Sequence, residues 1–253
     1  MLLVLTYHRI VPDRATLKGF FDITADELDQ QLKQAGELWE RGAAPGELLG
    51  AVVKTSSENK GFLVTFDDGT ADHYHVAAPV LERNNVRGVF FCSTNLIGTE
   101  GYLSIAQCQE LQAQGHSIES HSHDHKKLIG LSGDDLRHQL TESHHVLHQL
   151  GLGRWNFIAV PGGYFDANVQ SAAKSAGYAL LRTLEWGYNR RPAPLQIQSI
   201  TINRKTAGRW YQPLISPRGE FAKQAFYRGK EWLKNGWLKS LYFRVRDRGK
   251  KRR

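Results

Sequence analysis

The chain has 253 residues, of which 41% are hydrophobic and 23% charged, an ordinary composition for a globular protein that buries a full core. The formal charge of +8 belongs to the C-terminal segment: residues 211–253 carry 13 Lys/Arg against 3 Asp/Glu, whereas the remaining 210 residues carry 20 against 22. The slightly acidic body therefore gives no reason to expect nucleic acid as a partner. No stretch approaches the roughly 18 apolar residues of a membrane span.

The N-terminus and the cysteines bear on the compartment. The apolar start, residues 1–5, is too short for the hydrophobic region of a signal peptide and is instead predicted to be the first buried strand. Cys92 and Cys108 lie in neither a CxxC pair nor a metal-ligand spacing, which favours two buried free thiols over a disulfide. Both features lead us to expect a reducing, cytoplasmic location.

Short β-rich runs alternate with helical patterns along the body of the chain. Strands are predicted at 2–6, 62–66, 88–93, 117–119, 157–160, 179–183 and 197–202. Helices are predicted at 25–39, 77–84, 105–114, 131–150 and 168–176. This alternation indicates an α/β fold of βαβ units with a parallel sheet, and about seven repeats could close into a barrel.

Unusual polar residues come just after the predicted strands. They are His8, Asp67, Asp68, His121, His125 and the turn 161–163. Because chemistry in such folds takes place at the carboxyl ends of the strands, we expect these residues to converge on one face.

Asp67 and Asp68 follow the second main strand and precede Gly69, which permits a sharp exit. Adjacent side chains on extended backbone point in different directions, so one carboxylate can bind a metal while the other faces the reacting water. An ordinary Asp-Asp-Gly turn is the alternative interpretation.

Residues 115–125 contain four histidines, at positions 116, 121, 123 and 125. One helical turn after the strand would bring the imidazoles of His121 and His125 to a single ion. Two histidines and one carboxylate make a suitable open site for a catalytic divalent metal. A solvated histidine-rich loop is the alternative.

Three segments resemble the motifs of the polysaccharide deacetylase family, carbohydrate esterase family four. Residues 65–69, with 71–72 and 78–81 after them, resemble its first motif; residues 115–125 resemble the second, and residues 159–162 the third. The resemblance covers residues 2–205. It implies a distorted (β/α) barrel of seven or eight strands, one divalent metal ion, usually zinc, and N-deacetylation of sugars.

The resemblance also implies a role for each matching residue. Asp67 corresponds to the catalytic base, and Asp68, His121 and His125 correspond to the three metal ligands. The backbone N–H of Gly162 corresponds to the donor that stabilises the oxyanion.

Two positions depart from the family pattern. Ala159 stands where the third motif has an Arg, so Asp67 is expected to lack its cationic neighbour. No histidine follows His148, so the family's late catalytic histidine is absent. His8, at the end of the first predicted strand, is our candidate for the missing acid, and a purely structural role for His8 is the alternative.

Residues 211–253 are interpreted as a basic, helical tail beyond a catalytic domain of residues 1–210. Apolar side chains recur on one face of a predicted helix, mostly at steps of four: Phe221, Ala225, Leu233, Trp237, Leu241 and Val245. Basic and aromatic residues accompany them, as in helices that lie on anionic membranes. A helix packed on the barrel with a solvated basic end is the alternative.

The sequence thus indicates a metal-dependent enzyme that deacetylates an N-acetylated glycan or glycan precursor at the cytoplasmic membrane face. A catalytically weak or inactive barrel that binds glycan is the alternative, because the late histidine is missing. A nucleic-acid-binding protein would account only for the tail.

Overall fold

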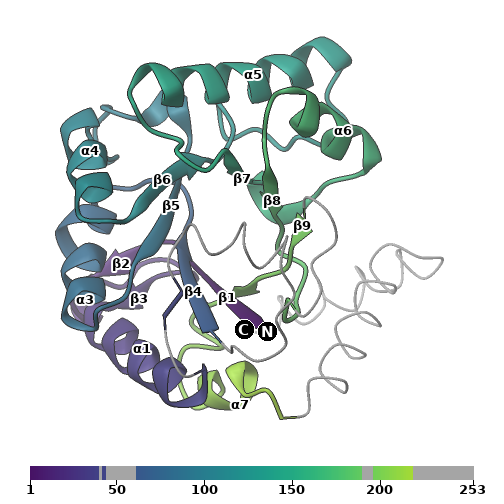
Figure 1. Cartoon of the computed structure of the whole chain (residues 1–253). Coiled ribbons are helices and arrows are strands. Elements are labelled where there is room, and N and C mark those ends of the chain that lie inside the picture. Colours follow the sequence, from purple (N-terminus) through teal and green to yellow (C-terminus); the bar gives the residue numbers. More distant parts are fainter. Residues whose placement is uncertain (40–41, 44–60, 190–195, 219–253) are drawn as a thin grey trace, which may run out of the picture. The chain divides into compact units, whose positions relative to one another are not determined.

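The computed structural model describes residues 1–39, 42–43, 61–189 and 196–218. Residues Met1–Ile215 form one compact unit around an eight-stranded parallel sheet, in the order β10-β1-β4-β5-β6-β7-β8-β9 (Figure 1). The strands are β1 (Leu2–Tyr7), β4 (Gly61–Phe66), β5 (Gly88–Cys92), β6 (Ser117–Ser120), β7 (Phe157–Ala159), β8 (Leu180–Arg182), β9 (Gln196–Ile197) and β10 (Ile200–Thr201). The predicted α/β barrel is confirmed.

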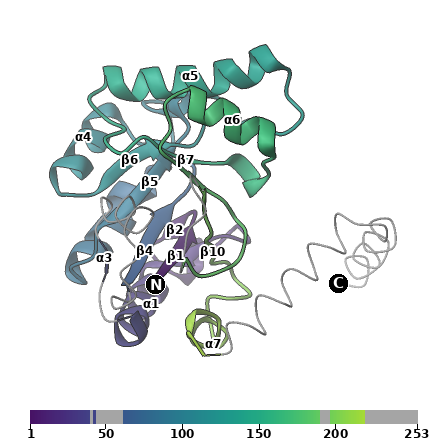
Figure 2. The same cartoon turned by 45° about the vertical axis from the view of Figure 1, so that its right-hand side comes forward.

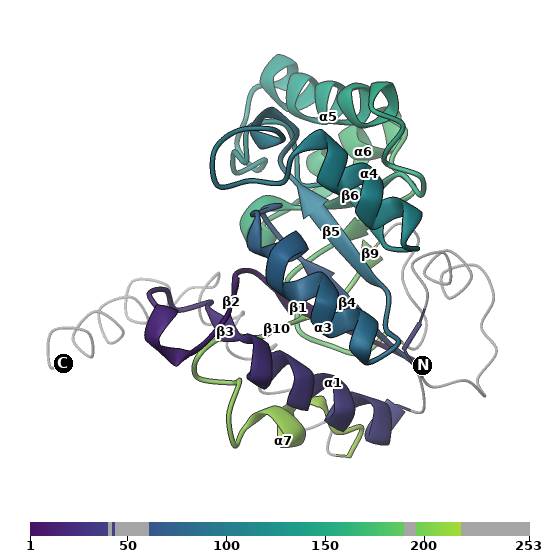
Figure 3. The same ribbon diagram turned by 90° about the vertical axis from the view of Figure 1, so that its left-hand side faces the viewer.

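Helices lie on the outer side of this curved sheet (Figures 1 and 3). They are α1 (Ala25–Trp39), α3 (Ala78–Arg83), α4 (Ile105–Ala113), α5 (Gly133–Gln149), α6 (Ala167–Ser175) and α7 (Tyr211–Ile215). A separate pair of short parallel strands, β2 (Ile10–Val11) and β3 (Ile23–Thr24), lies between β1 and α1 in the chain. None of the helices in the described part of the chain is both long and apolar enough to cross a membrane.

The strands sort their side chains between two faces because successive residues point in opposite directions. Along β1, Leu3 and Leu5 pack with the outer helices, whereas Leu2 and Val4 belong to the cluster that fills the barrel interior. Thr6 continues the interior row, and its hydroxyl lies 3.0 Å from that of Thr65 on β4. The interior therefore becomes polar toward the carboxyl ends of the strands.

The predicted strand 197–202 is wrong as a single element. The chain forms β9 and β10 instead, which pair with β8 and β1 at opposite edges of the sheet. The side chain of Asn189 occupies the break: its Nδ2 donates to the Gln198 carbonyl at 2.9 Å, and its Oδ1 accepts from the Gln198 N–H at 3.0 Å. These bonds satisfy backbone groups that a continuous strand would have paired with a neighbouring strand.

Residues Tyr211–Ile215, which the sequence placed in the tail, belong to the compact unit. They form α7, which packs against α1 (Figures 2 and 3). The Tyr211 hydroxyl donates to the Gln31 carbonyl at 3.0 Å, and Trp39 Nε1 donates to the Ile215 carbonyl at 2.9 Å. The compact unit therefore extends past residue 210, and the predicted helix over 220–245 lies outside the described residues.

Candidate active site

The carboxyl ends of β4 and β6 place the predicted acids and histidines side by side. The Asp67 N–H donates to the Tyr7 carbonyl at 2.9 Å, and the His121 N–H donates to the Cys92 carbonyl at 2.8 Å, so each residue extends its strand by one position. Asp68 then turns out of the strand direction with a φ of 77°. The turn requires the next glycine, Gly69, because a Cβ there would lie 2.7 Å from Cys92 Sγ.

Asp68, His121 and His125 form the candidate metal centre. Asp68 Oδ1 lies 3.5 Å from His121 Nε2 and 3.1 Å from His125 Nε2. Within the described ranges, this is the only group of three His, Cys, Asp or Glu side chains whose ligand atoms all lie within 4.8 Å of one another. The sequence-predicted ligand set is thus assembled.

The chemistry of these side chains fits a divalent ion. His121 Nδ1 lies 2.8 Å from the Ala159 carbonyl, which leaves Nε2 directed at the group. A backbone acceptor on the far nitrogen fixes the tautomer and ring orientation that a metal ligand needs. Burial opposes ionisation of Asp68, but its close contacts with the His121 and His125 imidazoles outweigh burial and hold the pKa of Asp68 far below its usual range. An anionic oxygen and two imidazole nitrogens suit zinc-type ions.

The predicted helical turn between the two histidines is wrong. Ser122 and His125 both have left-handed backbone, with φ of 66° and 56°, so the segment is a loop. It is held from two sides. Gln139 on α5 bonds Asp124 twice, accepting from its N–H at 2.9 Å and donating to its Oδ2 at 2.8 Å. The Thr94 N–H donates to the Ser122 carbonyl at 3.2 Å. These anchors, and not helical spacing, bring His125 to Asp68.

Asp67 has a cationic partner that sequence reasoning missed. Arg182 on β8 forms an ion pair with Asp67, and both side chains are buried. Ala159 of β7, where the family motif has its Arg, is the register partner of Arg182 on the neighbouring strand. The expectation that Asp67 lacks a positive neighbour is therefore wrong: the positive charge comes from Arg182 on β8, the strand next to β7.

This ion pair decides the protonation state of Asp67. Burial opposes ionisation, but the attraction of the Arg182 guanidinium is stronger and lowers the pKa of Asp67 below its usual range. The carboxylate is thus anionic at neutral pH. It lies beside the candidate metal ligands: His121 Nε2 is 4.0 Å from Asp67 Oδ2.

His8 also reaches the site. Its Nε2 lies 4.0 Å from Asp67 Oδ2, and its ring stacks on Phe21 with centroids 4.5 Å apart. Burial lowers the pKa of His8, although Asp67 and Asp68 act in the opposite direction. His73 is fully buried, and its Nε2 contacts the His8 carbonyl at 2.8 Å. His8 is held close to the base in a neutral form.

Gly162 lies in the turn Pro161–Gly163 that follows β7. The Gly163 N–H closes this turn on the Val160 carbonyl at 2.8 Å, and Gly162 has a φ of 67°. A Cβ on Gly163 would approach Leu184 Cβ to 2.5 Å, so the turn accepts only glycine there. The predicted oxyanion donor thus follows β7, the strand whose Ala159 carbonyl contacts His121.

A parallel barrel with acids and histidines at the carboxyl ends of its strands has the architecture of an α/β-barrel enzyme. The chain belongs to the polysaccharide deacetylase family, whose model matches residues 54–181. It is 32% identical over 128 residues to the putative polysaccharide deacetylase YxkH of Bacillus subtilis. This match covers 51% of the present chain and 46% of YxkH. It is 24% identical over 146 residues to a chitooligosaccharide deacetylase of Azorhizobium caulinodans, covering 57% and 66% of the two chains. The matches thus span about half to two thirds of these relatives.

Solved structures share the fold. The Streptococcus pyogenes deacetylase PplD superposes with a TM-score of 0.75 at 23% identity, over 85% of this chain and 98% of that one. IcaB from Ammonifex degensii superposes with a TM-score of 0.73 at 23% identity, over 85% and 96%.

Proposed function

We propose that the chain is a metal-dependent hydrolase that removes acetyl groups from the N-acetylated sugars of a glycan or glycan precursor. The observation that carries the proposal is the position of Asp67: an anionic, buried carboxylate beside the Asp68–His121–His125 group but outside it. A second carboxylate next to a metal centre can move a proton without serving as a ligand. Family membership and the names of the relatives support the choice of an N-acetylated sugar as substrate.

The proposed metal is one zinc ion held by Asp68, His121 and His125. When bound, such an ion supplies a Lewis acid that polarises the acetyl carbonyl and lowers the pKa of water. The remaining steps use residues of the chain. Asp67 removes a proton from the water that attacks the acetyl carbon, and Arg182 keeps Asp67 anionic before that step. The proposed donor for the oxyanion is the Gly162 N–H.

Cleavage of the C–N bond releases acetate and requires a proton on the departing amine. Neutral His8 brings no proton of its own at neutral pH. The proton that Asp67 removed from water balances the reaction, and His8, 4.0 Å from Asp67, is the proposed carrier to the amine.

The experiment combines metal analysis with acetate release from a panel of N-acetylated sugars and oligosaccharides. Asp67→Asn is expected to abolish turnover and keep the metal, since Asp67 moves a proton and does not bind the ion. His125→Ala is expected to lose the metal while the fold survives. Full metal occupancy in His125→Ala, or wild-type rates in Asp67→Asn, would falsify the assignment.

A glycan-binding barrel with little or no activity is the second candidate. It is favoured by one observation, the absence of any histidine after His148 in the sequence. Binding of N-acetylated oligosaccharides by the wild-type protein without acetate release, at full metal occupancy, would support it.

A further inference from the structure

We propose that Phe20 and Phe21 form a preformed stacking surface for a sugar residue next to the one that is deacetylated. This makes the preferred substrate an oligomer, not a single sugar. The inference rests on the proposed glycan substrate and adds a binding site to it. We call the two side chains the Phe20–Phe21 platform.

The platform is an unusual surface feature. Phe20 and Phe21 are 48% and 40% exposed, and their rings meet edge to face with centroids 5.1 Å apart. Large apolar side chains that are neighbours and remain exposed mark binding surfaces more often than isolated ones do. The two rings are therefore suited to bind a ligand with an apolar face.

Contacts lead from the platform to the proposed base. The ring of Phe21 stacks on His8 at an interplanar angle of 22°, and His8 Nε2 lies 4.0 Å from Asp67 Oδ2. Phe21 thus contacts the ring that lies next to Asp67, and Phe20 contacts Phe21. A sugar that reacts at Asp67 would place its neighbour in the same chain over these rings.

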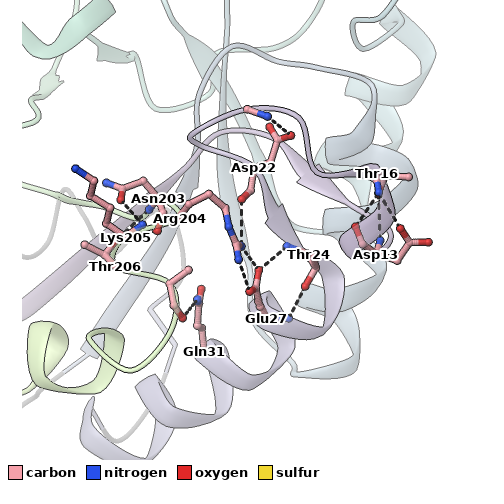
Figure 4. Close-up of polar contacts among 12 residues, drawn as sticks. Asp13, Thr16, Asp22, Thr24, Glu27, Gln31, Asn203, Arg204, Lys205 and Thr206 are labelled. Atoms are coloured by element: carbon pink, nitrogen blue, oxygen red, sulfur yellow. Dashed lines mark hydrogen bonds and ion pairs between the residues drawn. The ribbon is translucent and has the colours of Figure 1, made fainter. Parts of the chain in front are cut away.

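The loop that carries the platform is held in place by its own hydrogen bonds. Asp22 Oδ2 accepts from the N–H groups of Lys18 and Gly19, both at 2.7 Å. The Arg204 N–H donates to the Phe20 carbonyl at 2.9 Å. The guanidinium of Arg204 pairs with Glu27 of α1, so this residue ties the loop to the helix (Figure 4).

A fixed aromatic surface suits sugar recognition. The C–H groups on one face of a pyranose carry partial positive charge, and an aromatic face is partially negative. Because the loop is already ordered, binding costs little conformational entropy. Lys205 Nζ lies 5.8 Å from the centre of the Phe20 ring and could also meet an anionic lipid. The direct contact of Phe21 with His8 favours the sugar.

The experiment measures binding of a β-1,4-linked N-acetylglucosamine tetramer by calorimetry, in a metal-loaded Asp67→Asn background that prevents turnover. Phe20→Leu keeps an apolar side chain but removes the flat ring, whereas Phe20→Tyr keeps the ring. We expect Phe20→Leu to weaken binding roughly tenfold, the scale of losing one good apolar contact, and Phe20→Tyr to retain it. Trp210→Leu removes another exposed aromatic ring, 56% exposed and outside the platform, and is the matched control.

Three results would overturn the proposal: equal tetramer affinity in the Leu and Tyr variants of Phe20, the same loss in the Trp210→Leu control, or no tetramer binding by the parent protein. Sedimentation with phosphatidylglycerol vesicles tests whether the platform binds an anionic lipid instead of a sugar. Weaker vesicle binding by a Phe20→Glu variant with unchanged tetramer affinity would assign the surface to a membrane. The proposed function is tested by a separate measurement: it fails if the metal-loaded wild-type protein releases no acetate.

Discussion

Arg182 gives Asp67 the charge that family comparison expected at position 159. Because Ala159 and Arg182 are register partners on adjacent strands, an arginine at either position can reach the same part of the barrel interior. The pair joins residues 115 apart in the sequence, so no local pattern could indicate it. The one signal was an arginine inside an otherwise apolar predicted strand, since a buried arginine needs a partner.

Replacing Arg182 by Met is expected to raise the pKa of Asp67, because burial then acts on the carboxylate without its main opposing charge. The proposed base acts only when it is ionised, so the acid limb of the pH–rate profile should move to higher pH. At pH 6 we expect kcat/KM to fall by about 10²-fold and to recover in part as the pH rises.

Two comparisons make this test specific. Arg182→Lys keeps the charge and should keep most of the activity, and metal content should be unchanged in both variants. An acid limb at its wild-type position in Arg182→Met would mean that Arg182 serves the fold alone.

His8→Ala should lower kcat by about 10²-fold at unchanged metal content, the usual scale for losing an acid–base group. The alkaline limb of the pH–rate profile should also change, because proton delivery to the amine is affected. Normal turnover in this variant would leave Asp67 itself to return the proton, and His8 would then have a structural role.

At the scale of elements, local signals predicted most helices well. The first helix was predicted at 25–39, where α1 lies, and its start has the reciprocal bonds of a capping box: Thr24 N–H to Glu27 Oε2 at 3.0 Å and Glu27 N–H to Thr24 Oγ1 at 3.2 Å. The loop 121–125 could not be predicted, because tertiary anchors on α5 and residue 94 impose its left-handed residues.

Gln139 gives a test of those anchors. Gln139→Ala removes both hydrogen bonds to Asp124 and should loosen the loop that carries His125. Apparent metal affinity, measured by competition with a chelator, is expected to fall roughly tenfold or more, the range for residues that orient metal ligands.

Gln149→Ala is the matched control, since Gln149 is an exposed glutamine at the end of the same helix. Equal metal affinities in the two variants would show that the loop keeps its shape without Gln139.

For the molecule as a whole, the sequence predicted a parallel barrel and the face on which its polar residues meet. It did not predict the two edges of the sheet, since β10 pairs with β1 from the other end of the chain, nor that the compact unit continues to Ile215. The membrane role of the remaining tail stays a prediction.

Removal of residues 219–253 tests that role. The described compact unit ends at Ile215, so the truncated protein should keep its thermal unfolding transition. We expect it to lose binding to phosphatidylglycerol vesicles, because the basic charge of the chain is concentrated in the tail.

The wild-type protein should bind the vesicles less well as salt rises. Failure of the truncated chain to fold would favour a tail helix packed on the barrel.

The junction between β9 and β10 has a consequence for self-association. A sheet edge offers unpaired backbone groups to strands of other molecules, and long, flat edges invite aggregation. Within the described residues, each edge of this sheet is a strand of only two residues, and the chain that leaves one edge at Ile197 enters the other at Ile200. The Asn189 side chain hydrogen-bonds both backbone groups of Gln198, which lies between the two strands. Within the described part of the chain, strand addition from another molecule therefore finds only two residues of edge strand on each side with which to pair.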